Sequence, residues 1–390
     1  MTEIAPEMWA KLPPEAVAAP VPPPAPTYGQ EVRRRLVSNK LAMGSIIFII
    51  CLVIAAFFGP MLSPHTYYKQ DLKLANIPPA FETYAIANTA GETTRLFLNA
   101  SNFNIYEVDD AGFVLGLVRG ERRDMLKKNQ LFEIGGEKVI LDYAKLPARL
   151  TLEDGTEIRP TGWSWNRTYL FGTDQLGRDI LVRQLYGAQI SLTVAFVATL
   201  VNFFIGVFYG GIAGYVGGKV DVVMMRIVEI ISTIPLTLYV VLLMVVFNSG
   251  LLSIIVAIGS VFWVDMARIV RGQILSLKSL DYVAAARTMG ASPARILTRH
   301  LLPNALGPII VTLTMLIPSA IFIESFMSFI GLGVTPPLAS WGSLTSEAVE
   351  TLRAYPHQLF FPAAAISLTM FAFNFLGDGL RDALDPRLSA

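Results

Sequence analysis

The sequence predicts an all-α polytopic membrane protein with a small β-rich insert outside the membrane. Of its 390 residues, 53% are hydrophobic and only 16% are charged, which is too apolar a balance for an ordinary soluble globule. Several uninterrupted apolar stretches are long enough to cross a bilayer as helices. One long segment instead alternates apolar and polar residues between turn signals, which is typical of β-strands.

Composition excludes several kinds of function. The net charge of +1 gives no argument for a nucleic-acid partner. The single cysteine, Cys51, lies inside the first apolar stretch, so no disulfide can form within the chain. One cysteine and three histidines do not supply a zinc framework. We therefore expect neither a metal site nor bound nucleic acid in this chain.

The first apolar stretch is expected to be an uncleaved membrane anchor. Residues 1–32 are rich in Pro and Ala, and we predict a disordered cytoplasmic tail there. The first transmembrane helix is placed at 33–64, where the basic stretch RRRLVSNK precedes an apolar run from Leu41 to about Leu62. A signal peptide is the alternative, because its apolar core also follows basic residues. The run is long enough to span and no small-x-small cleavage site follows it, which favours the anchor.

Five further apolar runs raise the expected number of spans to six. They lie near 190–212, 223–247, 251–270, 306–330 and 359–377. Basic residues gather before the first span and again between the fourth and fifth spans, whereas the short loops on the other side have almost none. The positive-inside rule therefore places both termini and the loop 272–303 in the cytoplasm.

The segment between the first and second spans, residues 65–168, is predicted to be an extracytoplasmic β-rich insert. Stretches such as NFNIYEV, FEIGGEKVIL and RLTLEDGTEI alternate in polarity and are split by Gly-Gly and Asp-Gly turns. We expect the strands to fall between about 75 and 160. Residues 169–390 then form the membrane core, with five spans and the cytoplasmic loop.

The loop 272–303 contains a well-delimited helix-turn-helix. Asp281 can begin the first helix, and Gly290 can adopt the left-handed backbone conformation that commonly ends a helix. Ser292-Pro293 is typical of the cap and first turn of a second helix. One face of the first helix is expected to present small side chains between two larger ones, flanked by Asp281 and Arg287: Tyr282, Ala285, Ala286 and Met289. A solvated linker is the alternative, but this face favours a docking surface for another protein.

The same loop resembles the "EAA" loop of type I ABC importer permeases. Ala284-Ala285-Ala286 is followed by three residues and Gly290, and nine residues later by His300-Leu301-Leu302-Pro303. The resemblance is to the oligopeptide/dipeptide branch. Two positions depart from the pattern: Ala284 replaces an acidic residue and His300 an apolar one. A charge contact with the partner at Ala284 is therefore not carried over.

Two more stretches resemble the C-type permease subunit of that branch. FGTDQLGRD, from Phe171 to Asp179, precedes the second span, and ESFMSFIGLG, from Glu324 to Gly333, closes the fifth. The family-motif and gate candidates that they supply are Gly172, Asp174, Gly177, Arg178, Asp179, Glu324 and Ser325. The resemblance covers about 33–64 and 168–390, and it leaves the tail and the β-rich insert outside.

The resemblance implies the type I permease fold and a subunit of a multi-pass transporter in a bacterial or archaeal plasma (inner) membrane. Its expected partners are a sister permease, two cytoplasmic ABC ATPases, an extracytoplasmic peptide-binding protein and membrane lipid. Such a chain is no enzyme and holds no cofactor, because ATP and Mg belong to the ATPases. Its implied cargo is di- and oligopeptides, with nickel complexes, opines or oligosaccharides as alternatives. A stand-alone channel or carrier and a membrane receptor are rival classes.

The remaining motifs have simpler interpretations. No G-x-x-x-x-G-K-[ST] phosphate loop occurs, and the glycines of Gly210 to Gly218 are expected to permit close helix packing. Arg226 with Glu229, and Asp265 with Arg268, have the spacing of local ion pairs. Glu324 has no basic residue within a turn, so both a functional gate and a structural anchor stay open for it.

Overall fold

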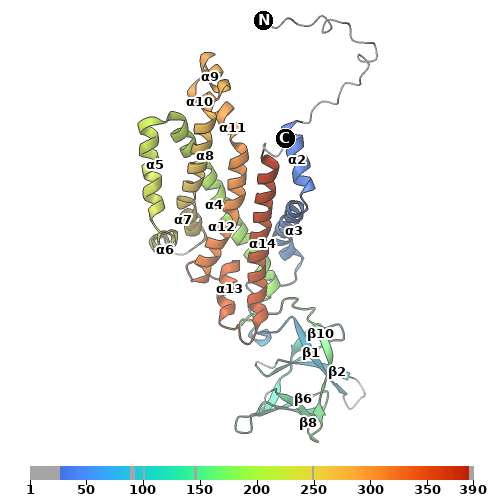
Figure 1. Cartoon of the computed structure of the whole chain (residues 1–390). Helices are drawn as coiled ribbons and strands as arrows, with labels where there is room; N and C mark the ends of the chain where they lie inside the picture. The colour runs from blue at the N-terminus through green and yellow to red at the C-terminus, as the bar shows by residue number, and fades with distance from the viewer. Residues whose placement is uncertain (1–26, 88–92, 100–101, 145–146, 248–249, 386–390) are drawn as a thin grey trace, which may run out of the picture.

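The chain folds into a helical bundle with a β-rich domain at one end and a short-helix loop at the other (Figure 1). The computed structural model describes residues 27–385 apart from 88–92, 100–101, 145–146 and 248–249. We call the two ends of the bundle the β-domain end and the loop end. Among the described residues, five helices are long and apolar enough to cross a membrane, and a bent helix pair brings the number to six if it counts as one span.

The five long spans and their bounds are α3 (Lys40–Leu62), α4 (Ile180–Val216), α7 with α8 (Leu251–Val261 and Trp263–Leu277, together Leu251–Leu277), α12 (Leu306–Phe329) and α14 (Pro356–Leu384). The second span starts ten residues earlier than the predicted 190, because its first turns include the buried polar residues Arg183 and Gln184 among the apolar ones. Asp179 caps this helix by accepting a hydrogen bond from the backbone N–H of Val182 at 3.2 Å.

The predicted span 223–247 is not one straight helix. α5 (Gly218–Thr233) and α6 (Leu236–Phe247) are bent by 87° at the break between them. Ile234 has extended backbone angles and precedes Pro235, whose ring disfavours the helical conformation for the residue before it. The periodic apolar pattern continues through this break, so the pattern alone could not reveal it.

Shorter helices complete the bundle. They are α2 (Tyr28–Ser38), α9 (Asp281–Thr288), α10 (Pro293–Ile296), a π-helical segment (Leu297–Leu301), α11 (Leu302–Asn304) and α13 (Trp341–Val349). The prediction of disorder to residue 32 is wrong from Tyr28 onward. Thr27 and Gln30 form a capping box, and a Glu31–Arg35 ion pair at 3.0 Å supports the first turns. The rest of that prediction concerns residues 1–26, which lie outside the described part of the chain.

Glycines bring α4 and α8 into close contact, as the sequence predicted for the run Gly210–Gly218. A Cβ on Gly210 would lie 2.3 Å from the carbonyl oxygen of Ala267, and one on Gly214 would lie 2.9 Å from that of Arg271. A Cβ on Gly206, one turn earlier, would lie 2.5 Å from the Cβ of Met266. The three glycines repeat every four residues, so they form one smooth stripe against α8.

The β-rich domain consists of two five-stranded antiparallel sheets. One has the order β10-β1-β2-β3-β4 and the other β5-β6-β7-β8-β9. The strands are β1 (Ala80–Ala87), β2 (Thr93–Asn99), β3 (Asn104–Val108), β4 (Val114–Leu117), β5 (Gly120–Asp124), β6 (Asn129–Ile134), β7 (Glu137–Asp142), β8 (Arg149–Leu152), β9 (Glu157–Ile158) and β10 (Pro160–Trp165). Ala80 pairs with Trp165, so the domain begins and ends at the same place beside the bundle.

Candidate functional site

The predicted helix-turn-helix is present at the loop end. α9 begins with Asp281, as the sequence predicted, and Leu280 is its cap residue. Gly290 has φ +79°, the left-handed conformation predicted for it, and a side chain there would meet no atom within 4 Å. Ser292 caps α10 by accepting a hydrogen bond from the N–H of Arg295 at 3.3 Å.

The outward face of α9 differs from the predicted one at a single position. Tyr282, Ala284, Ala285, Arg287 and Met289 are exposed, and Met289 is 81% exposed. Ala286 was expected on this face but is buried. Together with Val283, it packs inward on the apolar cluster that includes Ile274, Ile296 and Leu301.

Two cationic side chains in and beside α9 contact helix α4 of the bundle. The side chains of Lys278 and Arg287 lie over the ring of Tyr215, 5.7 and 5.9 Å from its centre, and Lys278 also donates a hydrogen bond to the Tyr215 carbonyl. Nearby, Arg271 forms a two-bonded ion pair with Asp221 at 2.5 and 2.6 Å, which joins α8 to α5. Arg287 thus joins α9 to α4, and the Asp221–Arg271 pair joins α5 to α8.

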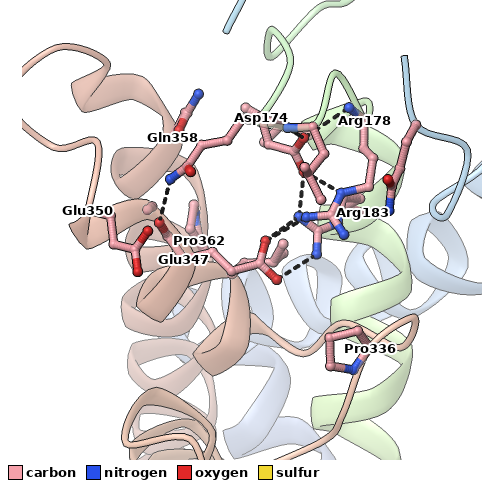
Figure 2. A pocket seen from close by; sticks show the side chains of 14 residues that line it. Asp174, Arg178, Arg183, Pro336, Glu347, Glu350, Gln358 and Pro362 are labelled. Atoms are coloured by element: carbon pink, nitrogen blue, oxygen red, sulfur yellow. Dashed lines mark hydrogen bonds and ion pairs between the residues drawn. The ribbon is translucent and has the colours of Figure 1, made fainter. Parts of the chain in front are cut away.

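At the β-domain end, the FGTDQLGRD stretch forms a buried ion-pair cluster (Figure 2). Asp174 accepts hydrogen bonds from Arg178 at 2.7 Å and from Arg183 at 2.6 Å. Glu347 on α13 contacts both arginines, at 2.8 and 2.7 Å. The side chain of Arg183 is only 2% exposed, so this cluster holds charges that could not be buried singly. We call these four residues the outer cluster.

The glycines of the same stretch bring it against the segment that follows the first span. Gly172 and Gly177 have φ +79° and +71°. A Cβ on Gly172 would lie 2.4 Å from the Ile77 carbonyl oxygen, and one on Gly177 1.9 Å from that of Asp71. The cap residue Asp179 is also buried here, and burial raises the pKa of its carboxyl group.

Glu324 is fully buried and is surrounded by hydroxyl groups rather than by cations. Its carboxylate accepts hydrogen bonds from Ser191 on α4 at 2.7 Å, from Ser328 at 2.8 Å and from Ser325 at 3.4 Å. Ser191 in turn accepts one from the backbone N–H of Trp341 at the start of α13. Through these hydrogen bonds the carboxylate links α4, α12 and α13.

Reasoning from the sequence missed Arg183, Glu347 and helix α13 itself. The segment between the spans predicted at 306–330 and 359–377 was expected to be a short loop, because the nine helical residues of α13 are too few to give an apolar run of spanning length. Arg183 stands among apolar residues at the start of a membrane helix, and an arginine there is a signal that could have been used. Within the described part of the chain, no three His, Cys, Asp or Glu side chains are grouped as metal ligands.

Both predicted local ion pairs are present. Arg226 and Glu229 lie 2.6 Å apart, and Arg268 and Asp265 lie 3.5 Å apart. All four side chains are exposed on the isolated chain.

The bundle, its loop and its outer cluster belong to a multi-pass membrane protein of the transporter class. Residues 206–390 match the family described as the binding-protein-dependent transport system inner membrane component, and residues 27–79 match the N-terminal TM domain of oligopeptide transport permease C. The dipeptide transport system permease protein DppC of Bacillus subtilis strain 168 is 40% identical over 94% of this chain and 88% of its own length. The chain therefore belongs to the family of dipeptide and oligopeptide transport permeases.

Other relatives match a smaller part of the chain. The oligopeptide transport system permease proteins OppC of Bacillus subtilis strain 168 and of Escherichia coli K12 are 52% and 51% identical, over 57% and 56% of this chain and 73% and 72% of their own lengths. The inward-facing MetNI methionine ABC transporter is a solved structure with 21% identity and a TM-score of 0.42, over 53% of this chain and 96% of the other. Because the Bacillus DppC match covers 94% of this chain, it extends through the β-rich insert. The expectation that the insert lies outside the family resemblance holds for the two family models, which leave residues 80–205 unmatched, but not for this relative.

Proposed function

We propose that this chain is the permease subunit of an ATP-driven ABC importer and that, with a sister permease, it forms the path for di- and oligopeptides. The observation that carries the proposal is the 40% identity to a dipeptide permease over nearly the whole chain. The exposed α9 supports it, because a helix seated on the bundle but open on its other face fits a surface completed by a second protein.

The proposed mechanism is mechanical rather than chemical. Two cytoplasmic ATPases would contact α9 through Tyr282, Ala285 and Met289, and their closure on ATP would displace that helix. The contacts of Lys278 and Arg287 with Tyr215 would transmit the displacement to α4, and the Asp221–Arg271 pair would carry it to α5 and α8. The bundle would then pass from inward-open to outward-open, and a peptide would enter from an external binding protein.

The orientation follows from the same scheme. The loop end and the helix α2 would face the cytoplasm, and the β-rich domain would lie outside, where a loaded binding protein arrives. The basic residues around α9 and α2 support this placement under the positive-inside rule. The outer cluster would fix the entrance, since it joins the start of α4 to α13 at the β-domain end.

Reconstitution tests the proposal. The chain, a sister permease, two ATPases and a peptide-binding protein are placed in liposomes, and uptake of a labelled tripeptide is followed. We expect uptake that needs both ATP and the binding protein. Equal flux without ATP would instead indicate a channel, and ATP-dependent uptake of a nickel complex, opine or oligosaccharide in place of peptide would change the cargo.

A further inference from the structure

An aspartate lies exposed halfway along a membrane-spanning helix. Asp265 is the fifteenth of the 27 residues from Leu251 to Leu277, and 68% of its side chain is exposed on the isolated chain. It lies about 20 Å along a helix about 40 Å long, and so inside the stretch that is long and apolar enough to cross a bilayer.

An ionised side chain at this depth does not face lipid without a large penalty. Aspartate at the centre of a membrane helix is among the residues least readily inserted into a bilayer. Intramembrane charges therefore face other protein or a water-filled cavity. For Asp265 the structure provides the cavity.

Two cavities adjoin Asp265, one on each side. The first has a volume of about 420 Å³ and is lined by Asp265 of α8, Ser319 of α12 and Asn374 of α14, with apolar side chains between them. The second has a volume of about 340 Å³ and contains Ser232 and Arg268 as well as Asp265. Ser319 and Asn374 are exposed polar residues inside long apolar helices. The helices α5, α8, α12 and α14 therefore each contribute a polar side chain to one of the two cavities.

The neighbouring arginine leaves most of the Asp265 carboxylate open. Arg268 donates its short hydrogen bond, 2.7 Å, to the Ser232 hydroxyl on α5, and reaches Asp265 only at 3.5 Å. The similarly spaced pair Arg226–Glu229 closes to 2.6 Å. A carboxylate accepts up to about four hydrogen bonds, so Asp265 keeps room for a cationic donor from outside the chain.

We infer that Asp265 binds the cationic amino group of the peptide as it passes through the membrane. Every peptide with a free amino terminus has this ammonium group whatever its side chains, so one carboxylate can serve a varied cargo. This inference rests on the proposed function, because it assigns a contact within the proposed path. Asp265 would be a substrate-binding residue, and Ser319 and Asn374 would line the cavity beside it.

Thiol labelling tests whether Asp265 faces water, independently of any transport. In the full reconstituted complex with Cys51→Ser, Ser319→Cys is treated with a cationic and an anionic membrane-impermeant methanethiosulfonate, with and without Asp265→Asn. We expect both reagents to label Ser319→Cys, and Asp265→Asn to lower the cationic-to-anionic rate ratio at least about threefold. A complex with the parent chain, which keeps Cys51 on α3 and has Ser319 in place, is the comparison, and Cys51 should stay unlabelled there. Absence of labelling at Ser319→Cys, or an unchanged ratio, would overturn the inference.

Uptake then tests the ammonium contact. Asp265→Asn should slow uptake of a neutral tripeptide with a free amino group about tenfold or more, and Asp265→Glu should restore part of the rate. Glu229→Gln is the matched control, because Glu229 belongs to the other Arg/acid pair and lines neither cavity. Equal uptake by Asp265→Asn and the parent complex, with the binding protein saturated, would refute the contact. If the parent complex takes up no peptide, the proposed function fails instead, while the labelling result still stands.

Discussion

The two ends of the bundle differ in whether their functional side chains are buried or exposed. At the β-domain end, the outer cluster buries two arginines and an aspartate, and every partner comes from the same chain. At the loop end, α9 leaves Met289 81% exposed and Tyr282 37% exposed. The first arrangement fixes a geometry that is complete within one chain, and the second fits a surface that another protein completes.

The difference separates what each end can do. A buried ion-pair cluster resists change, because separating its members would leave a charge unpaired in a medium of low dielectric constant. The exposed helix α9 contacts the core through only two buried side chains, Val283 and Ala286. We therefore expect changes at the loop end to affect coupling, and changes at the outer cluster to affect stability.

The largest effect is expected from blocking the docking face of α9. Ala285→Trp adds a large side chain to an exposed position, and Gly290→Val forces a β-branched residue into φ +79°, at a cost of at least about 1 kcal/mol. Each variant should abolish ATP-dependent uptake while the chain still inserts, as measured by transport and by membrane protein level. Met289→Ala is a milder control that should leave insertion unchanged. Normal uptake by both blocking variants would remove the docking role.

The second effect is a loss of stability at the outer cluster. Arg183→Ala removes a side chain that is 2% exposed and leaves Asp174 and Glu347 with a single cation between them. Removing one partner of a buried pair costs about 3–5 kcal/mol, so the purified complex should unfold at a clearly lower temperature. Arg149→Ala breaks an exposed pair with Glu157 at 3.5 Å and should cost no more than about 1 kcal/mol. Equal decreases in unfolding temperature for the two variants would contradict the stabilising role of the outer cluster.

Much of this contrast was predictable from the sequence, but not all of it. Local backbone chemistry predicted the turn at Gly290 and the cap at Ser292, because each depends on a single residue type. The outer cluster depends on Glu347, which is 164 residues from Arg183 and reaches it only once α13 packs on α4. No periodicity encodes such a contact. The inward position of Ala286 was missed for a related reason: the helix has apolar residues on two faces, and tertiary packing selects which one is buried.

A smaller effect is expected from removing the β-rich domain. Because Ala80 pairs with Trp165, and the N–H of Asn166 donates to the Pro79 carbonyl at 2.9 Å, a short Gly/Ser linker can join Pro79 to Asn166. We expect the membrane complex to assemble and its affinity for the binding protein to drop about tenfold, or about 1.4 kcal/mol. Titration of the binding protein and its stimulation of ATP hydrolysis measure this. Unchanged values in a complex that dissociates more easily would assign the domain to packing on the sister permease.

The smallest effect is expected at Glu324, although it is as fully buried as any residue of the outer cluster. Its partners are serine hydroxyls, which can rotate to donate or to accept, whereas the arginines of the outer cluster can only donate. Glu324→Gln keeps the size and the hydrogen-bonding capacity, so it should change stability by about 1 kcal/mol or less and retain most uptake. Glu324→Ala leaves Ser191 and Ser328 without this acceptor and should cost about 1–3 kcal/mol for each. Uptake of acidic, neutral and basic tripeptides by Glu324→Gln is the deciding measurement, because an anchor predicts equal retention for all three. A selective loss for one charge class would return Glu324 to the gate, and the burial of a carboxylate without a cation would then serve transport rather than the fold.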